Sequence, residues 1–337
     1  MKALVLAAGL GTRLRPLTDV WPKPALPLLG QPLLRYALGV LARAGVTDLG
    51  LNTHHLPDVM SHLAIVEAGR AGMAVTLSHE PVIQGTAGGI RGLRHVVERE
   101  DLFVVWNGDA LFTPDLAPLV AEHRASRAVA TLVLLPMPPG GAFATVDLDA
   151  SGQVRRIAGR GPGGERLTAW HFSGVHLLSP AVFDAMAASG PEDINRDVYP
   201  RLIAAGASVR GAVVQAAWND VGTPARYLAA QMDLLTGAMP DVFGAGSPFA
   251  GATLDGGVWS KPGARVEGTV RGPVFLDAGA VVESGASAGP NVYLGPGARV
   301  RAGSSIERAA LLGGEAPPGG IEGVILWDGG RVAERAE

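Results

Sequence analysis

Hydrophobic residues in the first two thirds of the chain alternate between short continuous runs and stretches with helical spacing. Residues 2–7 form a continuous apolar run, as expected for a strand buried on both faces of a sheet. Residues 32–44 carry apolar side chains at helical spacing and stop at Gly45, a residue type that commonly follows helices. This alternation predicts an α/β fold with a Rossmann-like, mostly parallel sheet flanked by helices.

The following segments continue the same alternation. Since parallel sheets bind ligands beyond the carboxyl ends of their strands, functional residues are expected in the loops that follow these strands. The Gly-rich residues 140–164 predict a hairpin or an insertion. Further strands are predicted over 47–52, 73–78, 102–106, 129–135, 170–178, 209–214 and 218–221, and further helices over 58–68, 116–125, 180–187, 196–204 and 224–235.

The last third of the chain shows a different pattern, in which apolar residues recur every six positions. Gly or Asn recurs at the same interval, three positions out of phase, and accepts the left-handed turn conformation. This repeat predicts a left-handed β-helix with one inward apolar residue per short strand. The expected domains are 1–236, a linker over 237–251, and the β-helix with its C-terminal tail over 252–337. The inward positions are Leu276, Val282, Ala288, Leu294, Val300, Ile306 and Leu312, and the turn positions are Gly279, Gly285, Asn291, Gly297 and Gly303.

Composition narrows the classes of function. The 337 residues carry a formal charge of −3 without a basic or acidic block, so no nucleic-acid partner is expected. No apolar stretch approaches the ~20 residues that span a bilayer, so no membrane association is expected. The absence of cysteine excludes disulfides, thiolate metal sites and cysteine nucleophiles, and it suits a cytoplasmic location.

Small residues follow the first predicted strand, from Leu6 through Ala8, Gly9, Gly11 and Thr12. They would let the backbone amides come close to a phosphate chain. Arg13 and Arg15 add guanidinium groups that suit phosphate oxygens. The loop lacks the Gly-Lys-Ser/Thr of a P-loop and the third Gly of a dinucleotide fingerprint, so by itself it fits a structural turn equally well.

Lysine is rare in this chain, with three residues against 25 arginines. One of them, Lys23, stands between Pro22 and Pro24, which fix the backbone on both sides. A compact ammonium group held in this way suits a phosphate, although a solvated lysine in a Pro-rich turn is the alternative.

Together, the segments Gly9–Thr18 and Pro22–Pro24 resemble the signature of the sugar-phosphate nucleotidylyltransferases. This family includes mannose-1-phosphate guanylyltransferases and N-acetylmuramate-1-phosphate uridylyltransferases, and a hexapeptide-repeat tail is found on many members. Residues 1–236 would form the nucleotidyltransferase domain. Four more segments match in order: Gln84–Gly89 resembles the loop that holds the base, Asn107–Asp109 and Trp218–Pro224 the metal-binding segments, and Phe172–Val175 the sugar-binding strand.

The resemblance implies roles for individual residues. The triphosphate and base would contact Leu6, Ala8, Gly9, Gly11, Thr12, Gln84, Gly85 and Thr86, and the sugar would contact Asn107, Gly108, Gly174 and Asp220. Catalysis would depend on Arg13, Lys23 and Asp109.

Asp109 and Asp220 would bind Mg²⁺, an ion that takes few carboxylates and completes its shell with water and phosphate oxygens. Asp109 alone would equally fit a helix cap. The expected reaction joins a nucleoside triphosphate to a sugar 1-phosphate by in-line attack, and it needs no protein nucleophile.

One departure from the family's pattern and two alternative functions remain. The family's Glu-Lys-Pro segment is absent, and Arg160 is the candidate to replace its lysine. The chain could instead be a non-catalytic regulatory subunit that binds nucleotide sugar. Such a subunit would be expected to lose one of four charged residues that this chain keeps, namely Arg13, Lys23, Asp109 and Asp220. An acyltransferase role for the tail is disfavoured because no histidine follows His176. The tail is therefore expected to serve assembly or regulation, for example as a homo-oligomer interface.

Overall fold

The computed structural model describes the whole chain except residues 139–142, 163, 165, 244–245 and 335–337. The described residues group into two compact units, one made of 1–9 and 37–218 and the other of 10–36 and 219–337. The domain boundaries expected from the sequence therefore stay a prediction. Among the described residues, no helix is both long and apolar enough to cross a bilayer.

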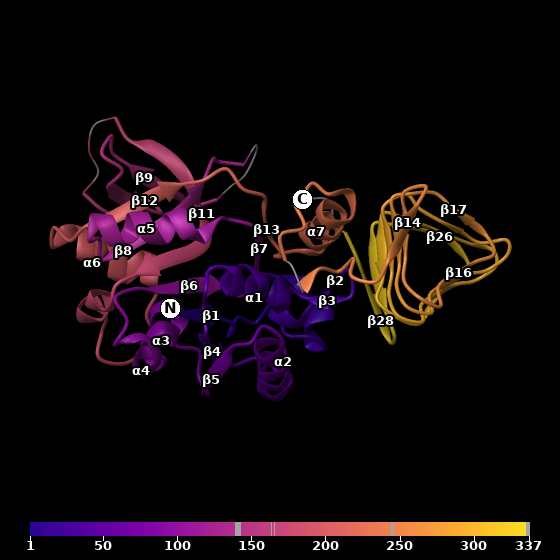
Figure 1. Cartoon of the computed structure of the whole chain (residues 1–337), viewed down its shortest axis with the longest axis horizontal. Helices are drawn as coiled ribbons and strands as arrows, with labels where there is room; N and C mark the ends of the chain where they lie inside the picture. The colour runs from indigo at the N-terminus through magenta and orange to yellow at the C-terminus, as the bar shows by residue number, and fades with distance from the viewer. Residues whose placement is uncertain (139–142, 163, 165, 244–245, 335–337) are drawn as a thin grey trace. The chain divides into compact units, whose positions relative to one another are not determined.

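The first unit contains a mixed nine-stranded sheet (Figure 1). The strands β6, β1, β4 and β5 pair in parallel, whereas β11 runs antiparallel to β6, β8 and β9. The carboxyl ends of the parallel strands therefore lie at one edge. The strands are β1 (Lys2–Leu6), β4 (Asp48–Thr53), β5 (Ala74–His79), β6 (Phe103–Asn107), β8 (Ala130–Leu135), β9 (Thr145–Leu148), β10 (Val154–Ile157), β11 (Thr168–Leu178) and β12 (Val209–Val213).

Apolar residues hold this sheet and its helices together. Ala3, Leu4 and Val5 of β1 have no exposed surface, as the continuous apolar run predicts. Side chains of α3, α4 and α6 share a core with residues of β6 and β8, such as Phe103 and Leu132. The helices are α1 (Leu33–Arg43), α2 (Pro57–Arg70), α3 (Gly85–Gly92), α4 (Arg94–Val97), α5 (Leu116–Ser126), α6 (Tyr199–Ala204) and α7 (Pro224–Thr236), and short strands lie at β7 (Ala110–Phe112) and β13 (Trp218–Asp220).

Two predicted segments differ in detail. The Gly-rich stretch contains the antiparallel hairpin β9–β10, while residues 140–142 and 163 of the predicted range lie outside the described residues. The predicted helices at 180–187 and 196–204 are a 3₁₀-helix over Pro180–Ala185 and a π-helical turn over Ile194–Val198 that continues into α6.

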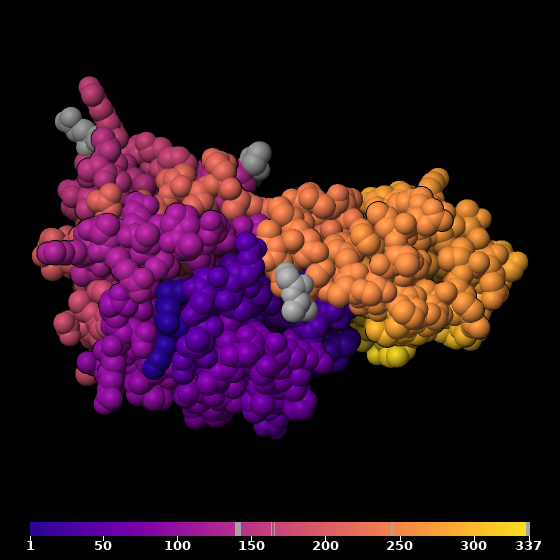
Figure 2. All heavy atoms as spheres, in the orientation of Figure 1, coloured from indigo at the N-terminus to yellow at the C-terminus, as the bar shows by residue number. Residues whose placement is uncertain are grey.

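The second unit contains three stacks of short strands that pair in parallel, except for the antiparallel end strands β14 and β28 of the largest stack. This arrangement is consistent with the predicted left-handed β-helix. Figure 1 shows its stacked coils in orange and yellow, and Figure 2 shows the atoms of the same coils closely packed. The largest stack is β14 (Thr253–Asp255), β15 (Val258–Ser260), β18 (Val274–Leu276), β21 (Val292–Leu294), β24 (Ala309–Leu311), β27 (Val324–Trp327) and β28 (Gly330–Ala333). The second is β16 (Arg265–Val266), β19 (Val281–Val282), β22 (Arg299–Val300) and β25 (Glu315–Ala316), and the third is β17 (Thr269–Val270), β20 (Ser287–Ala288), β23 (Ser304–Glu307) and β26 (Gly319–Glu322).

The six-residue period holds as far as Ile306 and then shortens. All five predicted turn residues have positive φ, including Asn291 at 61°. The next left-handed residue is Arg308, one position earlier than the period requires. Leu311 is therefore the residue aligned with Leu294, and the prediction of Leu312 as an inward residue is wrong.

A buried histidine makes the stability of the first unit dependent on pH. His176 of β11 is 1% exposed and is hydrogen-bonded to the hydroxyl of Tyr199. Burial lowers the pKa of His176 to about 3. The unfolded chain, with an ordinary histidine pKa near 6.5, binds one more proton between these values, so this contribution to stability is lost as the pH falls from about 6.5 towards 3.

We therefore expect the free energy of unfolding to depend less steeply on pH in His176→Gln than in the wild type. The difference should approach ~1.4 kcal/mol per pH unit between pH 6 and 4, measured by urea unfolding. The control His62→Gln, at an exposed position of α2, should keep the wild-type slope. Equal slopes for His176→Gln and the wild type would contradict the buried neutral state.

Candidate active site

A chain of buried hydrogen bonds organises the carboxyl edge of the parallel strands. The N–H of Ala7, just after β1, donates to Oδ1 of Asn52 at 2.7 Å. Nδ2 of Asn52 donates to Oε1 of Glu80 at 2.8 Å, and Oε2 of Glu80 accepts the N–H of Gln84 at 2.8 Å. Asn52 and Glu80 are 3% and 5% exposed. This chain links the end of β1, near Leu6 and Ala8, to the segment predicted to hold the base.

That segment is a helix rather than the expected loop. Gln84 is its N-terminal flanking residue, and α3 begins at Gly85. Glycine normally disfavours a helix, but close packing requires it here. A Cβ on Gly85 would lie 2.5 Å from the carbonyl oxygen of Glu192, and one on Gly89 would lie 2.5 Å from Nδ2 of Asn52. The glycines therefore let α3 approach both the β4 end and the segment around Glu192.

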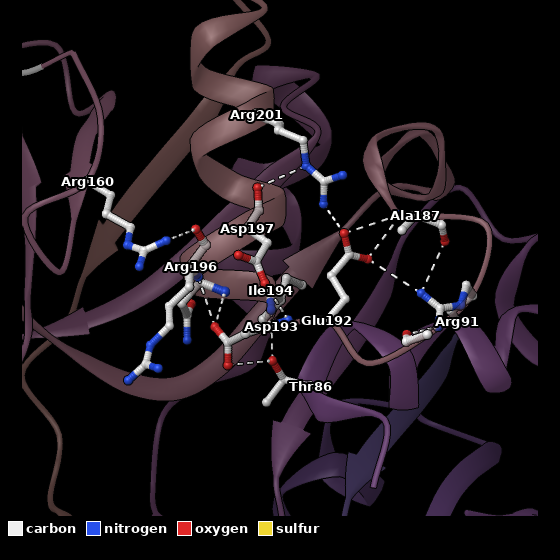
Figure 3. A network of polar contacts seen from close by, with 12 residues as sticks. Thr86, Arg91, Arg160, Ala187, Glu192, Asp193, Ile194, Arg196, Asp197 and Arg201 are labelled. Atoms are coloured by element: carbon white, nitrogen blue, oxygen red, sulfur yellow. Dashed lines mark hydrogen bonds and ion pairs between the residues drawn. The ribbon is translucent and has the colours of Figure 1, made fainter. Parts of the chain in front are cut away.

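Polar contacts fix the start of α3 to the segment before α6 (Figure 3). The hydroxyl of Thr86 accepts the N–H of Ile194 at 2.8 Å and donates to Oδ2 of Asp193 at 3.2 Å. The carboxylate of Glu192 accepts hydrogen bonds from Arg91 and Arg201. The side-chain hydroxyl of Thr86 is thus engaged within the protein, so a contact of Thr86 with nucleotide would use its backbone.

Arg160 belongs to the same region of the first unit. Its Nη1 donates to the carbonyl oxygen of Arg196 at 3.1 Å, and its side chain is exposed (Figure 3). Its replacement of the family lysine stays a prediction.

Three of the four predicted sugar-binding residues, all but Asp220, meet where β6 and β11 end their regular pairing. The register of β11 against β8 shifts between Phe172 and His176, which marks an irregularity near Gly174. Gly174 has φ +87°, and a Cβ there would stand 3.0 Å from Nδ2 of Asn107. The N–H of Gly108 donates to the carbonyl oxygen of Leu6 at 2.9 Å. The structure therefore brings Asn107, Gly108 and Gly174 together beside the end of β1, and Asp109 follows them half-buried.

The glycine-containing loop is divided between the two units. Gly9 closes the first segment of the first unit, where it is exposed and a Cβ would meet nothing within 4 Å. Gly11 belongs to the second unit and has φ +63°, and its carbonyl oxygen accepts the hydroxyl of Thr18 at 2.9 Å. Thr12 and Arg13 are exposed in the 3₁₀-helix that follows. Backbone and side chains here are accessible to a ligand.

Arg13 and Asp220 meet at a glycine of the second unit. Nη2 of Arg13 lies 3.1 Å, and Oδ2 of Asp220 3.2 Å, from the point where a Cβ on Gly222 would stand. Nη1 of Arg226 contacts both carboxylate oxygens of Asp220 at 2.7 Å. Arg13 and Asp220, more than 200 positions apart in the sequence, therefore both lie next to Gly222, which has no side chain.

Lys23 is enclosed within the second unit. It lies in a 3₁₀-helix over Lys23–Ala25, and the whole residue is 8% exposed. A lysine this enclosed carries a large desolvation cost unless it is paired, which is consistent with a specific role.

The donor chemistry of Asp109 and Asp220 suits a hard divalent cation, and neither side chain is fully buried. Asp109 belongs to the first unit and Asp220 to the second. No group of three or more His, Asp or Glu residues that could hold a metal occurs in the described part of the chain.

Asn52 and Glu80 are positioning residues that the sequence interpretation did not identify. A polar residue at the end of the predicted strand 47–52 and an acidic residue just after β5 were the available signals. Their pairing depends on the adjacency of β4 and β5, which only the fold supplies.

Comparison with known proteins agrees with this geometry. Residues 2–237 match the family model described as "Nucleotidyl transferase". The chain is 33% identical over 314 residues to the mannose-1-phosphate guanylyltransferase of Mycobacterium tuberculosis, covering 91% of this chain and 83% of that protein. It is 32% identical over 301 residues to the glucose-1-phosphate thymidylyltransferase of Streptomyces griseus, covering 88% and 81%.

Among solved structures, HddC from Yersinia pseudotuberculosis in complex with GMP-PN overlaps with a TM-score of 0.58 at 22% identity. The overlap covers 69% of this chain and 98% of HddC. It confirms the predicted fold class.

Replacing Asn52 with alanine removes the acceptor for Ala7 and the donor to Glu80. We expect Asn52→Ala to lower the free energy of unfolding by about 1–3 kcal/mol, because buried polar groups lose their partners. The control Gln153→Ala removes one partly buried hydrogen bond to Ser208 and should cost less than about 1 kcal/mol. Urea unfolding measures both, and a smaller loss for Asn52→Ala than for the control would contradict the assignment.

Proposed function

Because the chain belongs to the nucleotidyl transferase family, we propose that it transfers a nucleoside monophosphate from a nucleoside triphosphate to a sugar 1-phosphate. The observation that carries this proposal is the meeting of Arg13 and Asp220 at Gly222. A cation and a carboxylate beside a residue without a side chain leave room for a phosphate chain and its counter-ion.

The reaction follows from charge and position. An oxygen of the sugar phosphate attacks the α-phosphorus, the bond between the α-phosphorus and the bridging oxygen breaks, and pyrophosphate leaves on the opposite side. Exposed Arg13 would neutralise the departing pyrophosphate, and the ammonium group of Lys23 would hold the sugar phosphate against the α-phosphate. No step needs a proton shuttle or a protein nucleophile.

We further propose that the divalent metal generally used by this family is Mg²⁺ here, with Asp109 and Asp220 as its protein ligands. The ion would neutralise charge on the phosphate oxygens. Binding would require Asp220 to share or exchange its contacts with Arg226, which leaves Arg226 available for a phosphate oxygen.

The substrates are proposed from the relatives' names. Guanylyl-, thymidylyl- and uridylyltransferases of sugar 1-phosphates all match the chain, and guanylyltransferases of mannose 1-phosphate recur among them. GTP with mannose 1-phosphate is therefore the first pair to test. The cytoplasmic location, the lack of a nucleic-acid partner and a homo-oligomer through the β-helix stay predictions.

The rarity of lysine provides a matched test of Lys23. With the active substrate pair, Lys23→Met should lower kcat/KM by at least ~100-fold, the scale of losing one charge-stabilising donor. Lys2→Met removes a half-exposed lysine that lies 3.7 Å from Glu100 and should retain near-wild-type activity. Pyrophosphate release measures both, and comparable losses in the two variants would contradict the role of Lys23.

Asp109→Asn tests the reaction itself. In a panel of triphosphates and sugar 1-phosphates with Mg²⁺, the wild type should release pyrophosphate with at least one pair. Asp109→Asn should lose this activity while its unfolding curve stays like that of the wild type. If the wild type binds nucleotide sugar but releases no pyrophosphate with any pair, the protein is a regulatory subunit instead.

A further inference from the structure

One stack of the β-helix is buried on its outer face as well as its inner one. In β18 and β21, the flanking residues belong to the core of the β-helix, so the central residues Phe275 and Tyr293 point outward. These two are 0% and 1% exposed. Outward residues of the other two stacks, such as Arg265 and Ser305, are exposed. The largest stack is therefore covered by other parts of the second unit.

The ring of Phe249 packs on Phe275. Helix α7 contacts β24 and β27, and the segment 10–36 contacts Tyr293 and β28. That segment includes Lys23 and the short hairpin β2 (Pro27–Leu28) and β3 (Gln31–Pro32). The N–H of Leu29 in its turn donates to Oε1 of Gln231 in α7 at 2.6 Å. Trp21 also packs edge-on against Trp327 of β27, with ring centroids 6.3 Å apart. The segment on both sides of Lys23 is thus held by α7 and the β-helix.

The tip of the hairpin contacts a buried polar cluster of the β-helix. A Cβ on Gly30 would lie 2.3 Å from Oδ2 of Asp277 and 2.9 Å from the hydroxyl of Tyr293. Asp277 is 4% exposed and accepts the hydroxyl of Tyr293 at 3.0 Å. Nζ of Lys261 lies 3.4 Å from Oδ1 of Asp277. Lys261, the third lysine of the chain, therefore forms an ion pair with the buried carboxylate that contacts the hairpin tip.

We propose that Asp277 and Tyr293 are positioning residues for nucleotidyl transfer, which set the place of Lys23 through the tip of the β2–β3 hairpin. Lys23 lies four residues before this hairpin, and Pro24 and Pro27 stiffen the chain between them. A movement of the hairpin against the β-helix would therefore move the ammonium group. This inference rests on the proposed function, and it assigns the β-helix a part in catalysis as well as in assembly.

The test adds a methyl group at the contact and compares it with a glycine of the same backbone conformation. Gly30 has φ +77° and close neighbours, whereas Gly237, after α7, has φ +78° and nothing within 4 Å of its Cβ position. Both alanine variants carry the same backbone strain, but only Gly30→Ala pushes the hairpin away from Asp277 and Tyr293. Tyr293→Phe is a milder variant that removes only the hydroxyl.

Gly30→Ala should raise KM for the sugar 1-phosphate at least tenfold and leave KM for the triphosphate within twofold of the wild type. Gly237→Ala should retain wild-type values. Hydrogen exchange of the amides over 26–33 should be at least tenfold faster in Gly30→Ala and several-fold faster in Tyr293→Phe. A mere loss of folded protein would lower the apparent kcat and leave both KM values unchanged.

Equal kinetic constants for Gly30→Ala and Gly237→Ala would overturn the proposal. If Gly30→Ala does not fold, the same measurements are made on Tyr293→Phe. Wild-type kinetic constants together with unchanged amide exchange over 26–33 in that variant would overturn the proposal. If the wild type itself transfers no nucleotide, the proposed function fails. The exchange measurement then decides separately whether the β-helix holds the hairpin.

Discussion

The amide of Ala7 must find an acceptor at the point where β1 ends and the chain turns into the loop that is predicted to bind phosphate. A buried N–H without a partner costs about as much free energy as a lost hydrogen bond. If this N–H paired with a neighbouring strand, the strand would continue and no loop would form here. Asn52 of the neighbouring strand supplies the acceptor. Its side chain also donates to Glu80, which in turn accepts the N–H of Gln84. The loop after β1 and the start of α3 are therefore fixed by one set of hydrogen bonds.

Much of the fold could be predicted because its strands are buried and its repeats are regular. The apolar run of β1 and the six-residue period of the tail each have one simple structural interpretation. The helix α3 could not be predicted, since its glycines disfavour a helix locally and are justified only by the closeness of Glu192 and Asn52. The shift from Leu312 to Leu311 likewise depends on a left-handed Arg308, a conformation that no pattern in the sequence indicates.

The predicted family and reaction class are confirmed by the match to the nucleotidyl transferases. Five short motifs in the right order carried that prediction. The supporting residues Asn52, Glu80 and Asp277 were not predicted, because each has a partner that is distant in the sequence. Ala7 is 45 positions from Asn52, Glu80 is 28 positions from Asn52, and Tyr293 is 16 positions from Asp277. The individual roles of Arg13, Lys23, Asp109 and Asp220 stay predictions that depend on bound substrates.

We propose that this chain binds a nucleoside triphosphate along Gly9–Arg13 with the base at Gln84 and Gly85. The most direct measurement is a crystal structure of the full chain with Mg²⁺ and a non-hydrolysable triphosphate. The phosphates should be hydrogen-bonded to the amides of this loop, with Arg13 on the terminal phosphates and an ion held by Asp109 and Asp220. A nucleotide bound elsewhere, with Asp220 still paired with Arg226, would contradict this mode of binding.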